Sequence, residues 1–136
     1  MDERVHRALA ITPASSASDR TVEISTTGAR TGRIRRIEIW FYRVDGEIYL
    51  TTQPAARGWY ANLLANPEFT FHLRNGIRAD LPAAAEPVFD SDERRHIFAA
   101  IVSDLNQPLH RRYLSQPVEP VEEWVDRSPL MHVTFT

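Results

Sequence analysis

The side chains best suited to chemistry lie in one short stretch, residues 26–36, which reads Thr-Thr-Gly-Ala-Arg-Thr-Gly-Arg-Ile-Arg-Arg. Glycine lets the backbone bend tightly and present successive N–H groups, and a threonine hydroxyl adds a further donor. Arginine binds phosphate and carboxylate oxygens through paired hydrogen bonds. The stretch therefore predicts an anion-binding turn, whose candidate residues are Arg30, Thr31, Gly32, Arg33 and Arg35. An exposed hairpin turn with solvated arginines would have the same composition, so both interpretations stand.

A second candidate stretch, residues 53–62, joins a loop rich in Pro, Ala and Gly to the start of a helical pattern. Arg57 is placed to reach an anion, and Trp59 with Tyr60 would form an aromatic wall beside a planar ligand. Trp59 and Leu63 equally fit the buried face of a helix, because they are four residues apart. The role of Trp59 is left open between ligand contact and core.

Missing residue types exclude several kinds of catalytic site. The chain contains no cysteine, which excludes disulfides, thiolate nucleophiles and iron–sulfur ligation. All 16 basic residues are arginine, so lysine chemistry is absent. The five histidines lack metal-ligand spacing, so we expect no metal site. No Ser/His/Asp arrangement has local support, because Ser15, Ser91, Ser103 and Ser115 lack a nucleophile-elbow context. A binding site without an evident catalytic side chain fits an enzyme whose cofactor carries the chemistry.

Length and composition indicate one globular domain, with 136 residues, 43% of them hydrophobic. The net charge of −2 argues against nucleic-acid binding. No apolar run approaches the roughly 20 residues that cross a bilayer, and the polar start is unlike a secretory signal, so we expect a cytoplasmic protein. The domain division expected is an N-terminal arm over residues 1–20 and a cofactor-binding barrel over residues 21–136.

Alternating apolar residues predict the strands that must position these stretches. Residues 21–26 and 37–42 flank the arginine turn, and Asp45-Gly46 is a hairpin signal before a third strand over 48–51. Residues 69–73, 77–89 and 130–135 give three more strands, the fifth broken or bulged at Pro82, with Asn75-Gly76 as another hairpin turn. The expected fold is mainly β (α+β), a six-stranded antiparallel split barrel with a few appended helices.

The helical patterns are fewer. Residues 59–66 predict a short helix that stops at Asn66-Pro67, and a capping box at 90–93 precedes the main helix, whose apolar face includes Phe98 and Ile101. Prolines divide residues 108–120 into short helical pieces, with Tyr113 and Leu114 as anchors. The strand face carrying Trp40 and Tyr42 is expected to be exposed and would suit a homodimer interface.

Three segments, in their order and spacing, resemble the deazaflavin (F-420)-dependent nitroreductase family. These actinobacterial split β-barrel proteins are related to the flavin-binding pyridoxamine-phosphate-oxidase superfamily. The segments are residues 26–35, residues 59–67 (Trp-Tyr-Ala-Asn-Leu-Leu-Ala-Asn-Pro) and residues 124–129 (Trp-Val-Asp-Arg-Ser-Pro). The resemblance implies that Arg30, Thr31, Gly32 and Arg35, with Arg33 nearby, hold the phosphate and acidic tail of the coenzyme. It also implies that backbone groups of Thr52 and Gln53 pass along the deazaflavin ring and that the helix carrying Trp59 and Asn62 packs beneath it.

The activity implied is hydride transfer from the reduced coenzyme to a small electrophile such as a quinone or enone. The family usually has a second basic residue where this chain has Ala29, and its nitroimidazole-activating members have tyrosines where this chain has Val118 and Val121. These departures favour a different substrate pocket, suited to quinones. An FMN-binding oxidoreductase on the same barrel, or a non-enzymatic flavin- or tetrapyrrole-binding protein, remain alternatives. No catalytic residue is identified, and the partner expected is a small-molecule substrate.

Overall fold

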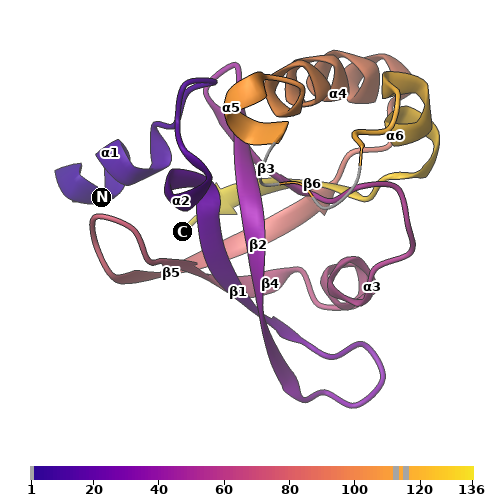
Figure 1. Cartoon of the computed structure of the whole chain (residues 1–136). Coiled ribbons are helices and arrows are strands. Elements are labelled where there is room, and N and C mark those ends of the chain that lie inside the picture. The colour runs from indigo at the N-terminus through magenta and orange to yellow at the C-terminus, as the bar shows by residue number, and fades with distance from the viewer. Residues whose placement is uncertain (1, 112–113, 115–116) are drawn as a thin grey trace.

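The computed structural model describes residues 2–111, 114 and 117–136, and its six strands close into a barrel (Figure 1). The six antiparallel strands confirm the predicted barrel, and the structure places neighbouring strands in the order β1-β2-β3-β6-β5-β4. The strands are β1 (Thr21–Thr27), β2 (Ile34–Val44), β3 (Glu47–Thr51), β4 (Glu68–Leu73), β5 (Ala79–Pro87) and β6 (Leu130–Phe135).

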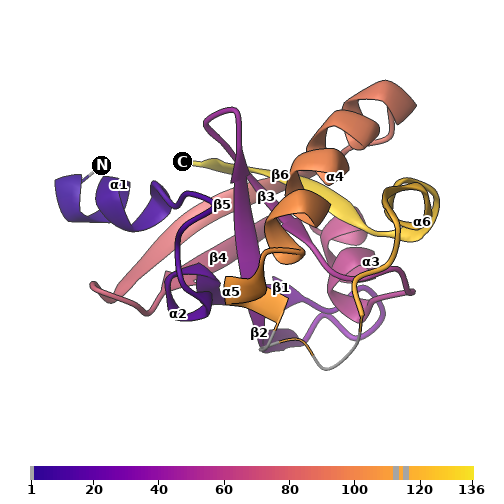
Figure 2. The same ribbon diagram turned by 45° about the horizontal axis from the view of Figure 1, so that its top comes forward.

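Helices cover the barrel on several sides (Figures 1 and 2). They are α1 (Glu3–Leu9), α2 (Ala17–Arg20), α3 (Gly58–Ala65), α4 (Ser91–Leu105), α5 (Pro108–Arg111) and α6 (Val121–Arg127). Helix α4 begins after the predicted cap, because the Asp90 side chain accepts a hydrogen bond from the backbone N–H of Glu93 at 2.9 Å. Within the described residues, no helix has the length and apolar composition needed to cross a membrane.

The barrel interior holds the first hydrophobic core. Inward side chains alternate along the strands, and Ile24, Phe41 and Phe71 are fully buried there. Helix α3 adds Trp59 and Leu63 to this core, and helix α1 adds Val5 and Leu9. The two helices lie at opposite ends of the barrel in both views (Figures 1 and 2). The helical turns expected near the N-terminus are therefore packed into the same core as the strands.

A second core lies outside the barrel, between the outer faces of β2 and β3 and helices α4 and α6. Tyr42 is only 5% exposed and packs in this core, and Trp40 is half-buried against it. The prediction of an exposed Trp40 and Tyr42 face is therefore wrong, because the apolar face of α4 covers it. Burial also raises the pKa of the Tyr42 hydroxyl well above its usual range. Leu114 packs against this core, whereas Tyr113 lies outside the described residues.

The hairpin turn at Asp45-Gly46 agrees with its sequence signal, whereas the irregularity predicted at Pro82 does not occur. Asp45 and Gly46 both have positive φ, at 53° and 80°, as a two-residue hairpin requires. Pro82 pairs with Thr70 in an unbroken register, so the predicted break or bulge is wrong. The Pro82 carbonyl accepts the N–H of Thr136 at 3.1 Å. Pro82 therefore lies opposite Thr136 at the very end of the β5–β6 ladder, where a missing N–H interrupts no pairing farther along the sheet.

Candidate functional site

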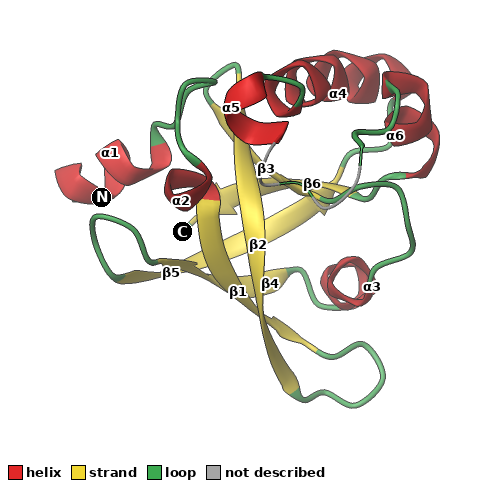
Figure 3. Ribbon diagram, viewed as in Figure 1, coloured by secondary structure: helices red, strands yellow, loops and turns green. Residues whose placement is uncertain are grey.

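The arginine turn connects β1 to β2 and projects beyond the barrel (Figure 3). It closes through a hydrogen bond from the Gly28 N–H to the Arg33 carbonyl at 2.7 Å and another from the Gly32 N–H to the Gly28 carbonyl at 3.0 Å. Gly32 has φ of +70°, and a Cβ on Gly28 would lie 2.8 Å from the Thr31 hydroxyl oxygen. Both glycines are therefore required by the backbone path that displays the arginines.

Helix α3 holds the turn in place through two asparagines. The Asn62 side-chain oxygen accepts the backbone N–H of Ala29 at 3.0 Å, and its amide nitrogen donates to the Thr26 hydroxyl at 3.2 Å. The Asn66 amide donates to the Thr27 carbonyl at 3.3 Å. Since α3 is itself anchored in the barrel core, these bonds fix the position of the turn relative to the barrel.

The turn carries concentrated positive charge. Arg30, Arg33 and Arg35 are exposed, and none of the three guanidinium groups pairs with a carboxylate among the residues that the structure describes. Arg36 differs, because its Nε donates to Glu23 Oε1 at 2.5 Å. Three cations on a short fixed loop form an electrostatic site for an anionic group of matching size.

A cleft of about 530 Å³ opens on the other side of α3. Arg57 and Tyr60 of the α3 region line it, and Arg57 also donates to the Gln53 carbonyl at 3.2 Å. Phe89 stands at its edge with 72% exposure. The remaining lining residues come from the loop before α3, from α4 and from the end of α6: Ala55, Ala56, Arg94, Val125, Asp126, Arg127, Ser128 and Pro129. An aromatic rim with cationic walls suits a planar, electron-poor or anionic ligand.

Arg94 lines this cleft and holds the neighbouring backbone segments together, and the sequence alone did not single it out as a site residue. Its guanidinium donates to the backbone carbonyls of Val88, Trp124, Val125 and Ser128 at 2.6–3.3 Å, which caps the carbonyl end of α6. Partial burial lowers the pKa of Arg94 from its usual range. The sequence did contain a signal for this residue. Arg94 lies three and four residues before the buried Ile97 and Phe98, at a position of α4 where the helical pattern predicts an apolar residue.

The loop after β3 is joined to the segment around α6. The Ser128 hydroxyl donates to the Thr52 carbonyl at 2.9 Å, and the Gln53 side-chain oxygen accepts the Glu119 N–H at 3.3 Å. Three buried side-chain polar atoms have no partner among the described residues: Nδ1 of His110 and, in this part of the chain, the Thr52 hydroxyl oxygen and the Trp59 indole nitrogen. Trp59 is 7% exposed and lies in the barrel core, which favours the structural interpretation of this residue.

The candidate residues therefore fall into two groups that meet at α3. Arg30, Thr31, Gly32, Arg33 and Arg35 form the turn to which Asn62 is bonded, while Arg57 lines the cleft next to the loop of Thr52 and Gln53. Val118 and Val121 do not line the cleft; they pack against the second core.

A family model for F420H(2)-dependent quinone reductase matches residues 13–116. The chain belongs to this family. All ten candidate residues lie inside the matched range, whereas the segment over residues 124–129 lies beyond it. The family resemblance inferred from the three segments is thereby confirmed.

A curated relative agrees with this assignment, and two solved structures share the fold. The F420H(2)-dependent quinone reductase Rv1261c of Mycobacterium tuberculosis is 30% identical over 106 residues, which are 72% of this chain. The match spans 66% of that relative's length. The crystal structure of Rv2991, also from Mycobacterium tuberculosis, has 19% identity and a TM-score of 0.64 over 99% of this chain and 81% of its own. A putative pyridoxamine 5′-phosphate oxidase from Listeria innocua has 8% identity and a TM-score of 0.63, over 98% and 91%. At these identities the structures establish the fold, a split barrel of the pyridoxamine-phosphate-oxidase type.

Proposed function

We propose that this protein is a deazaflavin-dependent quinone reductase, which uses the reduced coenzyme F-420 to reduce a quinone. The observation that carries the proposal is the arginine turn: exposed cations without carboxylate partners among the described residues, on a loop fixed to α3 by Asn62. The coenzyme of this family has a phosphate and an acidic tail, which match that turn in charge. The family assignment supports the same activity, although the match covers 66% of the curated relative.

The residues present fit such a coenzyme. Arg30, Thr31 and Arg35 would bind the phosphate and acidic tail, and Gly32 and Arg33 would complete the turn. The unpartnered Thr52 hydroxyl oxygen and Trp59 indole nitrogen are the polar atoms near the loop that the ring is expected to follow. When bound, the reduced ring supplies a hydride.

The acceptor would lie in the cleft. Tyr60 and Phe89 offer aromatic surface on which a quinone ring can stack, and Arg57 and Arg127 offer positive charge near the oxygens that gain electron density. Holding the acceptor there would orient it and exclude water on one side. Reduction to the hydroquinone needs one hydride and one proton, and the proton would come from water or from the Tyr60 hydroxyl.

Titration of the purified protein with oxidised F-420 and, separately, with FMN tests the proposal through quenching of coenzyme fluorescence. We expect saturable binding of F-420, and oxidation of reduced F-420 on addition of a soluble quinone such as menadione. Binding of FMN alone would favour the FMN-dependent alternative. Binding without turnover by any quinone would favour a carrier, and binding of neither coenzyme would contradict the proposal.

A further inference from the structure

A chain of hydrogen bonds crosses three strands on the outer face of the barrel, outside the proposed coenzyme site. The Ser25 hydroxyl oxygen lies 2.7 Å from Nε2 of His72, and Nδ1 of His72 lies 2.6 Å from Oδ1 of Asp80. This is a Ser-His-Asp arrangement for which the sequence offers no local support. No local motif marks it, because its members come from β1, β4 and β5.

Strand register brings the three residues together. His72 pairs with Glu23 on one side and with Asp80 on the other, so these three form one row across the sheet. Ser25 pairs with Thr70 in the next row and is therefore the diagonal neighbour of His72, within reach of an imidazole ring. All of these side chains point outward, because the residues that alternate with them along β1 and β4, Ile24 and Phe71, fill the barrel interior.

Of the two carboxylates next to His72, only Asp80 is hydrogen-bonded to its ring, because the other is paired with arginines. Glu23, which stands beside the ring in the same row, is engaged by Arg36 and Arg74. Asp80 is then the carboxylate that accepts the Nδ1–H, which directs the lone pair of Nε2 toward the serine. His72 is only 6% exposed, so its ring is held by its neighbours, while Ser25 is partly accessible from solvent.

We propose that Ser25 is an activated nucleophile and an acyl-acceptor site, with His72 as its base and Asp80 as the residue that positions His72. In the acylation step, the Ser25 oxygen forms a bond to the ester carbonyl carbon and Nε2 takes the hydroxyl proton. The bond between that carbon and the leaving oxygen then breaks, and Nε2 returns the proton to the departing alcohol. Water then attacks the acyl carbon while Nε2 takes a proton from it. The bond from that carbon to the Ser25 oxygen breaks, and Nε2 returns the proton to this oxygen, which releases the acid and restores Ser25.

The position of Ser25 limits the acyl donors. It lies within β1, whose backbone is paired with both β2 and β4, so its own N–H belongs to the sheet ladder. Arg36 lies opposite Ser25 across the β1–β2 ladder, but its charge is already paired with Glu23. Without a pair of free backbone donors we expect reaction with small activated esters, such as aryl acetates, and slow release of the acyl group.

The test is incubation of the full chain with p-nitrophenyl acetate, followed by peptide mass spectrometry and stopped-flow detection of p-nitrophenol. We expect a burst with acetylation of Ser25 ahead of the exposed Ser91, and loss of the burst in S25A. H72Q should acetylate more slowly by on the order of a hundredfold, the lower end of what a positioned base contributes. T70A, a neighbour in the same row as Ser25, should react like the unmodified protein.

Asp80 provides the second variant, because its side chain is 74% exposed and its replacement spares the core. D80N should slow the burst, because the carboxylate that accepts the Nδ1–H and positions the ring is gone, and the conservative D80E should recover part of the rate. Unchanged F-420 binding by each variant shows that the barrel is intact. Acetylation of Ser25 no faster than Ser91, or D80N and H72Q reacting as fast as the unmodified protein, would overturn the proposal.

Discussion

Asn62 combines two tasks in a single side chain. Its oxygen accepts the N–H of Ala29 in the turn, and its nitrogen donates to Thr26 in β1, so one residue of α3 holds the first half of the turn and the strand that leads into it. The Trp-Tyr-x-Asn pattern implied a helix beneath the coenzyme, and the structure gives the asparagine a concrete contact in the protein itself. Its importance for binding would then be indirect, through the position of the arginines.

Replacement of Asn62 by Ala should lower the free energy of unfolding by about 1–2 kcal/mol, the usual range for losing two hydrogen bonds. F-420 affinity should fall as well, because the turn loses its anchor. Urea unfolding and coenzyme titration measure the two effects. N62D keeps the acceptor for the Ala29 N–H and should lose less affinity than N62A. An N62A protein that folds and binds F-420 with unchanged affinity would separate the asparagine from the site.

Arg30 and Arg35 carry the coenzyme prediction directly. Each exposed guanidinium that binds the anionic tail is worth about 1.5–3 kcal/mol, so R30A and R35A should each weaken F-420 binding roughly ten- to hundredfold. Stability should hardly change, because both side chains are exposed. Arg78, exposed in the β4–β5 loop, is the matched control, and R78A should bind normally. Equal affinity of R30A, R35A and R78A would remove the arginine turn from the site.

At the scale of elements, the β1–β2 turn depends on close backbone approach. A Cβ on Gly28 would meet the Thr31 hydroxyl oxygen at 2.8 Å and the Arg33 carbonyl oxygen at 3.1 Å. Gly58, the first residue of α3, has open space at the same position. The two glycines are therefore a matched pair, one constrained and one free.

G28A should distort the turn and weaken F-420 binding, whereas G58A should fold and bind like the unmodified protein. Backbone amide chemical shifts of residues 28–33 report the distortion, and titration reports the affinity. If G28A kept both the shifts and the affinity, the hydroxyl of Thr31 would have moved aside without consequence, and the close packing would not be needed for binding.

The ion cluster on β1, β2 and β4 makes stability depend on pH. The hydrogen bond from Arg36 lowers the pKa of Glu23 below its ordinary value of 4.5, and Arg74 acts in the same direction. A carboxyl group with a lowered pKa in the folded state contributes stability above its unfolded pKa, and this contribution is lost as the pH falls through the folded value.

E23Q should therefore be less stable than the unmodified protein near neutral pH, and the two stability curves should converge as the pH falls below the ordinary Glu23 pKa of 4.5 and through its lowered folded-state pKa. Thermal unfolding followed by circular dichroism between neutral and acidic pH measures this. E38Q serves as the comparison, because Glu38 is also a carboxyl group on the outer face of the barrel, in β2. If stability changed with pH in the same way in E23Q and in the unmodified protein, solvent would be screening the attraction between Glu23 and the two arginines.

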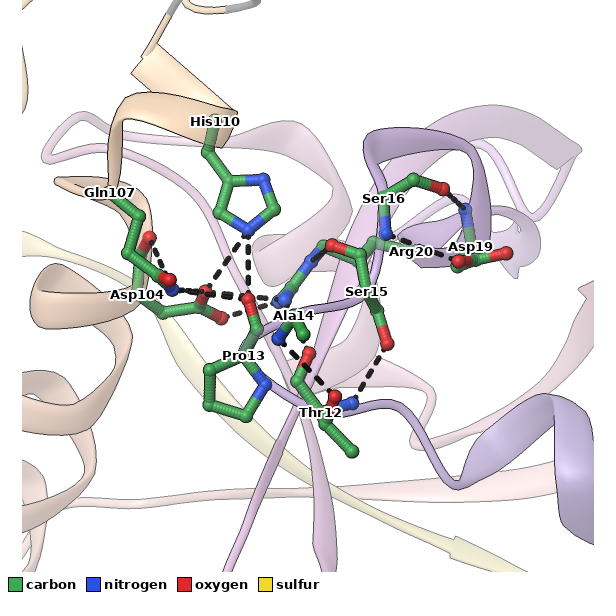
Figure 4. A network of polar contacts seen from close by, with 10 residues as sticks. All are labelled: Thr12, Pro13, Ala14, Ser15, Ser16, Asp19, Arg20, Asp104, Gln107 and His110. Carbon is green, nitrogen blue, oxygen red and sulfur yellow. Dashed lines mark hydrogen bonds and ion pairs between the residues drawn. The ribbon is translucent and has the colours of Figure 1, made fainter.

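At the scale of the whole molecule, a buried polar network ties the N-terminal segment to α4 (Figure 4). Arg20 is 1% exposed and donates to both carboxylate oxygens of Asp104, at 2.5 and 3.2 Å, and to the carbonyls of Thr12 and Ser15. Burial raises the pKa of Asp104 from its usual value, opposed by the charge of Arg20. His110 of α5 lies 3.3 Å from the same carboxylate. Helices α2, α4 and α5 therefore meet at the buried ion pair of Arg20 and Asp104.

D104A should destabilise the protein by about 3–5 kcal/mol, because it leaves the Arg20 guanidinium buried without its carboxylate. Chemical denaturation measures the loss, and hydrogen exchange should show faster opening of α2 and the preceding loop. Replacing both members together, as R20M with D104L, should recover part of the stability, since no charge is then left buried. A D104A protein as stable as the unmodified one would show that water takes over the role of Asp104.

The sequence alone determined features that depend on neighbours in the chain. Two-residue alternation and the Asp45-Gly46 signal predicted the strands and a hairpin, and the arginine turn was visible because its residues are consecutive. The cap at Asp90 and the apolar stripe of α4 followed from the same local rules. The motifs at residues 26–35, 59–67 and 124–129 indicated the family, because each is a continuous stretch of the chain that can be read without knowing the fold.

The tertiary structure alone decided which of these elements meet. Tyr42 is buried because α4, some fifty residues later in the chain, docks on β2, and no period within β2 records that docking. Arg94 reaches carbonyl groups around residues 124–128, and Ser25, His72 and Asp80 meet only through the register of three strands. Local patterns fix what each segment is, whereas long-range packing and strand pairing fix which side chains come within hydrogen-bonding distance.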